Sequence, residues 1–466
     1  MEKVKSDKLT LKHKIGYSLG DAGGCMTFAL MGTIFSVYCT DILLINPITL
    51  AAIVAIWNIW DFINDPIMGA LMDKSFVSSK NKKGKFRPWL LRATPLLCVT
   101  FIGLFTVPTF FDGIASLCFL FGLKILYEAS YTMFNIPMGS LLSAMSKNDE
   151  ERASLSSFRG IGSGIGNMIP IMVAPKLIKL YGETNAKGYA VAAIICALIG
   201  FVMCLLHYKL TEERNVSEVN SNNHEEAKDN VKFSDILKVF KVNKPFVALC
   251  VHGLFICMMQ YVTNNLSGYM YSVVLGDIGL VSDGTIISAP FMMLIFIFGA
   301  KLAKKFELVK LIRYSLLIGS ALYILLFGLH MITYVQPIIH MIISGVAMGI
   351  ASVSIYLQWG LVGDAIEHNQ KLTGKRTEGS IYGTFNLSRR VGQTIGHSGS
   401  LLLLAAIGYN ATLEVQSNLT ITGLKVLCVL LPGIIILGSW AAFKFIWKTN
   451  SKEKDNATIT ETQIEE

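Results

Sequence analysis

The feature that most constrains the fold is a series of twelve apolar segments, each about as long as a bilayer is thick. A helix needs roughly 20 mostly apolar residues to cross the hydrocarbon core. Only 16% of the residues are charged, against roughly 25% in an ordinary soluble protein. The sequence therefore predicts an all-α polytopic membrane protein. The candidate segments are 15–38, 48–72, 89–108, 114–143, 154–176, 188–208, 245–274, 280–303, 312–332, 336–362, 379–408 and 423–447.

Basic residues gather in alternate links between these segments, which sets the expected orientation. They lie before the first segment, after the second and after the eighth, whereas the links 40–47, 109–113, 275–279 and 333–335 contain no Lys or Arg. Cytoplasmic loops carry the excess of Lys and Arg. We therefore expect a multi-pass protein of the cell inner (plasma) membrane with both termini cytoplasmic. The net charge of +9 follows from this bias and does not indicate a nucleic-acid partner.

A polar segment at 209–243 divides the chain into two halves of six segments each. We expect an N-terminal six-helix bundle at 1–208, a cytoplasmic linker at 209–243, a C-terminal six-helix bundle at 244–447 and a cytoplasmic tail at 448–466. A weak internal repeat supports this division, because Gly139-Ser140-Leu141 and Gly360-Leu361-Val362 each precede a charged link. Two six-helix repeats, with the site near the midplane, are the architecture of major facilitator transporters. The predicted fold is therefore twelve transmembrane helices in two six-helix pseudo-repeats.

Enzyme chemistry finds no support in the motifs. The nine cysteines form no CxxC pair or Cys/His cluster, so neither a disulfide framework nor a zinc site is predicted. The glycine-rich run from Gly160 to Gly166 follows no strand and lacks the context of a nucleotide-binding loop. Glycines four residues apart instead permit close helix packing. We therefore predict a protein that is not an enzyme and has no cofactor beyond a coupling ion.

The densest polar cluster within an apolar segment is Asp61, Asn64 and Asp65. The two aspartates are four residues apart, so they share one helix face. A carboxylate in hydrocarbon is costly and commonly marks an ion or proton pathway. Carboxylate and amide oxygens suit a hard cation such as Na⁺, whereas a proton needs only one carboxyl group. We predict a coupling-ion site here, with Na⁺ at Asp61 and Asp65, the alternative being a structural ion pair with Arg159 or Arg390.

Other polar residues lie within the apolar segments and are candidates for binding a substrate. Asp21 in the first segment either pairs structurally or faces the cavity. Tyr131, Thr132 and Asn135 precede Pro137 in the fourth segment, as expected for a kinked helix that lines a cavity. Arginine side chains rarely face lipid, so Arg159 and Arg390 are candidates as well.

For three sets of residues, the sequence is compatible with both a structural and a functional role. Arg159 and Arg390 either compensate the acidic pair or clamp a substrate, and both roles can coexist. Lys124 and Glu128 are four residues apart and can pair with each other. His397 is either a core histidine or a proton relay. The aromatic and amide side chains that could contact a sugar ring are Tyr356, Trp359, Tyr382 and Gln393.

Four motifs in order along the chain resemble the glycoside-pentoside-hexuronide:cation symporter family over residues 12–445. They are Trp60-Asp61-Phe62-Ile63-Asn64-Asp65-Pro66-Ile67-Met68-Gly69, Gly84-Lys85-Phe86-Arg87-Pro88-Trp89-Leu90, Tyr131-Thr132-Met133-Phe134-Asn135-Ile136-Pro137 and Gly374-Lys375-Arg376-Thr377-Glu378-Gly379-Ser380-Ile381-Tyr382-Gly383. The resemblance implies that Asp61 and Asp65 hold Na⁺, Li⁺ or a proton, helped by Asn64 and Thr132. It also implies that Tyr131, Asn135, Arg159 and Arg390 lie at or near the sugar.

Four positions depart from the type member of that family: Cys25, Asn135, Gly139 and Arg390. The departures imply that the cation site is retained and that the type member's galactoside site is not. A uronide, a xyloside or another glycoside fits Asn135 and Arg390 better.

The sequence as a whole predicts a secondary active symporter that couples Na⁺, H⁺ or Li⁺ entry to uptake of a glycoside, pentoside or hexuronide by alternating access. The expected partners are the sugar, a monovalent cation and membrane lipid, and we expect a monomer. Predicted state-dependent gates pair Asp73 with Arg87, and Asp364 or Glu367 with Lys375 or Arg376. The rival interpretations are a lipid or lysolipid carrier on the same fold and a non-transporting membrane sensor.

Overall fold

The structure is a computed structural model that describes residues 9–78, 86–146, 148–214, 243–291, 306–373 and 378–447. Within these ranges the chain is helical and contains no strand. The predicted tail at 448–466 and most of the predicted linker at 209–243 lie outside the described residues.

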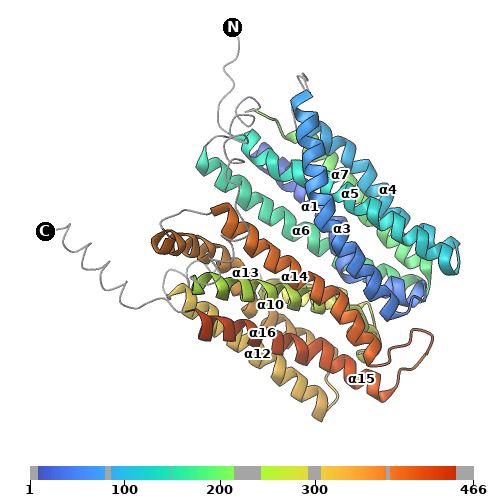
Figure 1. Ribbon diagram of the computed structural model, residues 1–466. Coiled ribbons are helices and arrows are strands. Elements are labelled where there is room, and N and C mark those ends of the chain that lie inside the picture. Colours follow the sequence, from blue (N-terminus) through green and yellow to red (C-terminus); the bar gives the residue numbers. More distant parts are fainter. Residues whose placement is uncertain are drawn as a thin grey trace, which may run out of the picture. The chain divides into compact units, whose positions relative to one another are not determined.

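The long helices follow the predicted apolar segments closely (Figure 1). Residues 280–291 are also helical. Short helical turns extend several of these elements, among them η1 (Tyr38–Ile42) and η4 (Met270–Val274). The helices are α1 (Leu11–Thr33), α2 (Phe35–Val37), α3 (Pro47–Ser78), α4 (Arg87–Thr106), α5 (Gly113–Met145), α6 (Asp149–Tyr181), α7 (Ala186–Leu210), α10 (Lys244–Tyr269), α12 (Leu308–Ile332), α13 (Pro337–Thr373), α14 (Glu378–Ala406), α15 (Asn418–Lys425) and α16 (Leu431–Ala441).

Eight spans in the described part of the chain are long and apolar enough to cross a membrane, and a ninth is α1 with the helical turns after it, bent by 49°. Within the described residues, the predicted segment 48–72 gives only a shorter apolar helix, Pro47–Trp60, which does not reach spanning length. The predicted segment 379–408 falls short because α14 is rich in polar residues. A polytopic membrane protein is thus confirmed.

The residues fall into two compact units by their contacts. Unit 1 comprises Met1–Asp229, Asn264–Ile286 and Ser398–Leu424, and unit 2 comprises Asn230–Thr263, Ile287–His397 and Lys425–Glu466. In unit 1, α1 packs on α6 and α7, and α4 packs on α5 and α7. In unit 2, α12 packs on α13 and α16. The predicted boundaries at 208, 243 and 447 come from the repeat in the sequence, whereas the two units are defined by contacts. The units therefore do not test these boundaries, which remain predictions.

Glycines bring α6 against the backbone of α1 in unit 1. A Cβ atom at Gly162 would clash with the carbonyl oxygen of Ser18, and one at Gly166 would clash with that of Ala22. By contrast, a Cβ atom at Gly164 would meet nothing within 4 Å. The glycine-rich run is therefore a packing surface, formed by Gly162 and Gly166.

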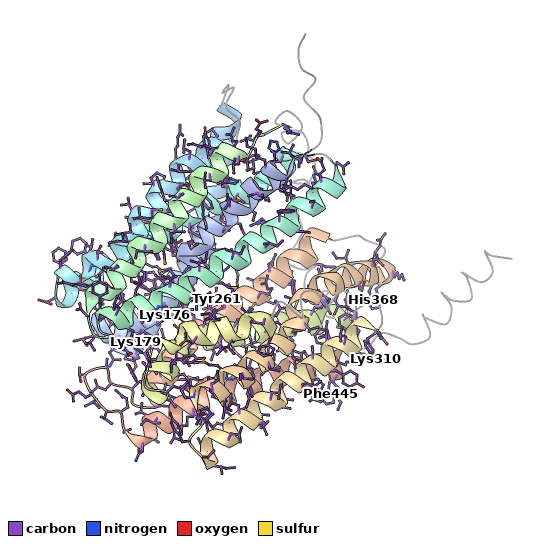
Figure 2. The ribbon with its side chains drawn as sticks, turned by 180° about the vertical axis from the view of Figure 1, so that it is seen from behind. Lys176, Lys179, Tyr261, Lys310, His368 and Phe445 are labelled. Atoms are coloured by element: carbon purple, nitrogen blue, oxygen red, sulfur yellow. The ribbon has the colours of Figure 1, made fainter. Side chains whose placement is uncertain are left out.

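The same pattern recurs inside unit 2, between α14 and α10. A Cβ atom at Gly392 would clash with the carbonyl oxygen of Leu254, and one at Gly396 would lie 2.6 Å from that of Met258. In each unit two glycines four residues apart contact two carbonyls four residues apart. The Tyr261 and His397 rings extend this contact, with centroids 6.0 Å apart (Figure 2 labels Tyr261). His397 thus contacts an aromatic ring, which leaves both of its predicted roles open, and the recurring glycine pattern supports an internal repeat.

Candidate functional site

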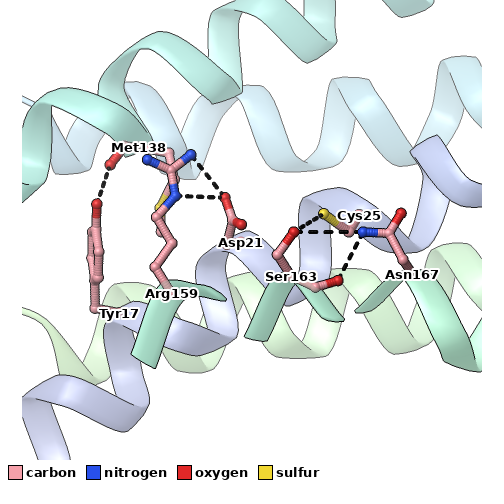
Figure 3. A network of polar contacts seen from close by, with 7 residues as sticks. All are labelled: Tyr17, Asp21, Cys25, Met138, Arg159, Ser163 and Asn167. Atoms are coloured by element: carbon pink, nitrogen blue, oxygen red, sulfur yellow. Dashed lines mark hydrogen bonds and ion pairs between the residues drawn. The ribbon is translucent and has the colours of Figure 1, made fainter. Parts of the chain in front are cut away.

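An ion pair between α1 and α6 is the central charged contact of unit 1 (Figure 3). Arg159 donates from Nε to Asp21 Oδ1 at 3.1 Å, and its Nη2 lies 3.1 Å from the same oxygen. The Asp21 side chain is 13% exposed and that of Arg159 is 34% exposed. Arg159 sits one turn before Gly162, so the close approach of the helices places the guanidinium beside α1. The side chains of Asp61 and Asp65 lie outside the described residues, so the alternative in which Arg159 or Arg390 pairs with them stays a prediction.

Polar contacts continue along the same α1–α6 contact (Figure 3). Cys25 Sγ and Ser163 Oγ are 3.3 Å apart. Asn167 donates from Nδ2 to the backbone oxygen of Ser163 at 2.8 Å. Asp21 and Cys25 are one turn apart on α1, as are Arg159, Ser163 and Asn167 on α6, so each set shares a face. The result is a line of hydrogen-bonding groups.

Helix α5 adds aromatic and amide groups to unit 1. The Tyr131 ring stacks on Phe28 of α1 with centroids 5.5 Å apart, and it lies 6.2 Å from the Tyr127 ring. Asn135, one turn further along α5, is exposed. A Cβ atom at Gly139 would be 4.0 Å from Arg159 Nη1. Tyr131, Asn135 and Arg159 therefore border neighbouring parts of one helix group.

A buried hydrogen bond joins α3 to α5 at the predicted cation site. Asn64 is 3% exposed and donates from Nδ2 to Thr132 Oγ1 at 2.9 Å. Asp61 and Asp65 lie on α3 within one turn of Asn64, but their side chains are outside the described residues. The structure thus brings together two of the four predicted cation ligands. Among the described residues no group of three His, Cys, Asp or Glu could hold a metal ion.

Lys124 and Glu128 of α5 form the predicted ion pair. Lys124 is 8% exposed, and its ammonium lies 5.7 Å from the Trp57 ring of α3 and 5.3 Å from the Tyr127 ring. Two rings and one carboxylate surround this cation, an arrangement that stabilises a desolvated ammonium. The pair lies one turn from Thr132, on the side of α5 that meets α3.

The remaining predicted sugar ligands belong to unit 2. Arg390 of α14 is partly buried, and its neighbour Arg389 packs its stem on α10, where a Cβ atom at Gly253 would lie 3.0 Å from Arg389 Cγ. The two arginines therefore point to different surroundings, as their 100° separation on a helix requires. The side chain of Tyr382 lies outside the described residues.

The predicted gates are described in part. Arg87 donates from Nη2 to the backbone oxygen of Tyr208 at 2.5 Å, and its guanidinium lies 4.5 Å from the Tyr208 ring. Glu213 accepts the backbone N–H of Arg87 at 2.7 Å. Asp364 and Glu367 are exposed on α13. Desolvation of its carboxyl group and the nearby Glu367 carboxylate raise the pKa of Asp364 above its usual range. The side chain of Asp73, and Lys375 and Arg376, lie outside the described part.

Sequence reasoning missed a second acidic site, at Asp41. The sequence predicts a link at 40–47, but residues Tyr38–Ile42 form the helical turn η1. Asp41 accepts hydrogen bonds there from Thr40 and Tyr409. The available signal was an acidic residue directly after an apolar run, which is also typical of an ordinary loop.

Comparison with known proteins places this geometry in a family. The model of the MFS/sugar transport protein family matches residues 16–447. The glucuronide carrier protein homolog of Escherichia coli (strain K12) is 28% identical over 453 residues, covering 95% of this chain and 93% of that protein. The symporter YjmB of Bacillus subtilis (strain 168) is 28% identical over 454 residues, covering 97% of this chain and 95% of that protein.

Solved structures share the fold at low sequence identity. The crystal structure of a D-xylose-proton symporter matches with a TM-score of 0.66 and 11% identity, covering 94% of this chain and 98% of that chain. The resemblance to the glycoside-pentoside-hexuronide:cation symporters and the major facilitator fold are thereby confirmed. The chain belongs to the MFS/sugar transport protein family.

Proposed function

We propose that this protein is a secondary active symporter that couples the entry of a monovalent cation to the uptake of a glycoside or hexuronide. The family and the names of the relatives support sugar-type symport. The observation that carries the choice of site is the buried Asn64–Thr132 hydrogen bond. It joins two helices at the turn of α3 that holds two acidic residues, and such residues inside a membrane span usually serve ion coupling.

The cation site consists of Asp61, Asn64, Asp65 and Thr132. Asn64 donates to Thr132 through Nδ2, so its Oδ1 remains as an oxygen ligand. Hard cations prefer oxygen ligands of this kind. Two ionised carboxylates one turn apart repel each other, and a bound cation offsets that repulsion. Na⁺ satisfies this arrangement, and H⁺ and Li⁺ are the alternatives that the first experiment separates.

The residues proposed to bind the sugar are Asp21, Tyr131, Asn135, Arg159, Tyr382 and Arg390. The Asp21–Arg159 pair offers both acceptor and donor atoms to sugar hydroxyls. A ring such as Tyr131 can cover an apolar sugar face, although it already stacks on Phe28. A guanidinium binds a carboxylate in a bidentate manner, so Arg390 favours a hexuronide.

The proposed orientation places the N terminus and the basic links in the cytoplasm of an inner (plasma) membrane. Transport proceeds by alternating access, with Asp73, Arg87, Asp364, Glu367 and Arg376 in cytoplasmic gates. Arg87 contributes by fixing the start of α4 to the end of α7.

Transport assays test the proposal directly. Membrane vesicles containing the protein are offered labelled glucuronides, xylosides and galactosides under an imposed Na⁺ or H⁺ gradient. Accumulation of one sugar that requires one gradient is the expected result. Asp61→Asn and Asp65→Asn should each abolish accumulation, whereas Asp112→Asn, on an exposed loop, should not.

Two outcomes contradict the proposal. Normal gradient-driven accumulation in both aspartate variants would remove the cation-site assignment. No accumulation of any sugar by folded, inserted protein would remove the sugar assignment, and a lipid or lysolipid carrier would then be the next hypothesis.

A further inference from the structure

The end of α1 opposite the N terminus carries an acidic residue that the proposed transport site does not use. The α1 helix bends by 49° before Phe35–Ile42, and this bent turn presents Asp41. Two stretches from the C-terminal half, 264–286 and 398–424, pack against this end within unit 1. Asp41 therefore sits where distant parts of the chain meet.

Only hydroxyl groups bind the Asp41 carboxylate. Thr40 donates to Oδ1 at 2.6 Å, and Tyr409 donates to the same Oδ1 at 2.9 Å. The Tyr269 hydroxyl is 2.8 Å from Thr40 Oγ1, which links η1 to the end of α10. Oδ2 accepts no hydrogen bond from the described residues. Because both hydroxyl groups donate to Oδ1, Oδ2 is free to carry a proton.

Two lysines at this end, Lys176 and Lys179, are bound by other carboxylates. Lys179 pairs with Asp277, and Lys176 Nζ is 2.9 Å from Asp283 Oδ1 (Figure 2 labels both lysines). Glu183 accepts the backbone N–H of Ile278 at 3.1 Å. No Lys, Arg or His within the described ranges forms an ion pair with Asp41. The nearby acid, Glu183, adds negative rather than positive charge.

The surroundings of Asp41 are buried and aromatic. Thr40 and Tyr269 are at most 2% exposed, and Tyr409 is 8% exposed. Tyr189 of α7 is 1% exposed, and its hydroxyl has no hydrogen-bond partner among the described residues. A carboxylate among such groups without a cation is costly, and binding a proton removes the cost. Among the described residues, the titratable groups that interact electrostatically with Asp41 are Tyr189 of α7, Tyr269 of α10, Tyr409 and Glu183, and Tyr38 and Cys39 precede it on η1.

A cavity gives water access to this cluster. It has a volume of about 290 Å³ and is lined in part by Thr40, Tyr409, Asn46 and Asn410. Thr40 and Tyr409 are the two groups that bind Asp41, so the cavity adjoins the carboxylate. Polar lining and this volume suit a few water molecules. A proton can therefore pass between bulk water and Asp41 without crossing the proposed cation site.

We propose that Asp41 is a proton-binding site, distinct from Asp61 and Asp65, whose protonated form holds this end of unit 1 closed. The proton comes from water in the cavity and binds Oδ2, while Oδ1 keeps the Thr40 and Tyr409 hydrogen bonds. Loss of the proton leaves an uncompensated anion, which favours separation of 264–286 and 398–424 from α1. Acidic medium should then favour the closed arrangement whichever ion drives sugar uptake.

Distance measurements by electron paramagnetic resonance test the proposal without a transport assay. Spin labels are placed at Leu180→Cys and Val415→Cys, two exposed positions of unit 1, in protein whose less buried cysteines, Cys98, Cys118 and Cys428, are replaced by Ser. In protein that retains Asp41, the fraction of molecules with a short distance between the two labels should grow at least twofold when the pH falls from about 8.5 to about 5. Asp41→Asn, which resembles the protonated acid, should keep that population high at both pH values.

Two further variants make the result specific. Tyr409→Phe removes one donor to Oδ1, so it should lower the short-distance population at both pH values while the pH dependence persists. Asp283→Asn alters an exposed acid at the same end and should leave the pH dependence unchanged. A pH-independent distance with Asp41 intact, an unchanged pH dependence in Asp41→Asn, or its loss in Asp283→Asn would each overturn the proposal. Sugar uptake can fail in the assays above without affecting this result.

Discussion

At the residue scale, the Asp21–Arg159 pair shows how unit 1 holds opposite charges inside a helix group. Both side chains are partly buried, so each charge depends on the other for compensation. Removing one partner of a buried pair costs more than the pair contributes, because it leaves an unpaired charge. Arg159 is about one-third exposed, however, and water therefore reduces that cost.

A double-mutant cycle measures this pair. Asp21→Asn and Arg159→Gln should each weaken sugar binding about tenfold or more, since each disturbs the same donor–acceptor surface. The double variant should be no worse than the poorer single variant, because the second change removes a charge already left without its partner. Isothermal calorimetry with the transported sugar gives the comparison. Lys310→Gln, which alters an exposed pair with Glu307, is the control, and additive losses would refute the coupling.

Asn64 and Thr132 support a second prediction about single residues. Asn64→Ala removes the buried hydrogen bond and one cation ligand, so cation affinity should fall about tenfold or more. Sugar binding in the absence of the cation should change little. The measurement is sugar affinity as a function of cation concentration. Ser130→Ala is the control, because Ser130 lies on α5 with Thr132 and donates to the backbone oxygen of Leu126; it should leave that dependence unaltered.

At the element scale, glycine spacing fixes the distance between α1 and α6. Gly166→Ala would place a methyl group against the carbonyl of Ala22. Overpacking of this kind costs about 1–3 kcal/mol, so the thermal unfolding midpoint should fall. Gly164→Ala is the matched control, since its methyl group would meet nothing within 4 Å. Equal midpoints in the two variants would show that the helices adjust freely.

The start of α6 holds Leu9, two residues before the first residue of α1, through Glu151. Glu151 accepts hydrogen bonds from Ser146 Oγ at 2.5 Å and from the backbone N–H of Leu9 at 2.8 Å. These bonds hold the pKa of Glu151 below its usual range. A lowered pKa in the folded state contributes stability above the unfolded pKa and loses it as the pH falls through the folded pKa.

The lowered pKa of Glu151 predicts how the stability of the Glu151→Gln variant depends on pH. The variant should unfold at a lower temperature than the parent protein at pH about 7, and the difference should shrink below pH about 4. Thermal unfolding at a series of pH values provides the test. A difference that is constant with pH would show that the carboxylate charge is irrelevant.

The elements that sequence reasoning recovered are those that repeat a simple physical signal. Apolar length predicted the spans, and spacing of four residues predicted the Lys124–Glu128 pair and the glycine packing. Sequence reasoning could not assign Asp21 as the partner of Arg159, because that contact depends on how α6 packs on α1. It missed Asp41 for a similar reason, since Tyr409 is 368 residues away in sequence.

At the scale of the whole molecule, the proposed symport requires that sugar and cation bind to a common state. The Asn64–Thr132 bond links the helix that carries the acidic pair to the helix that carries Tyr131 and Asn135. Cation binding that orders α3 would therefore also order the sugar-binding face of α5. Thermodynamic linkage then demands that each ligand change the affinity of the other by the same factor.

Equality of the two factors is the prediction at this scale. With the transported sugar identified, calorimetry should give sugar affinity with and without the cation, and cation affinity with and without the sugar. We expect both ratios to lie at about 5–150-fold and to agree, corresponding to about 1–3 kcal/mol of coupling. Thr132→Val should reduce both ratios together, because it removes the hydroxyl that joins the helices. The prediction fails if the affinity for the sugar is the same with and without the cation while the protein still accumulates that sugar under a cation gradient. The coupling would then lie in the rates of conformational exchange and not in the affinities of the bound state.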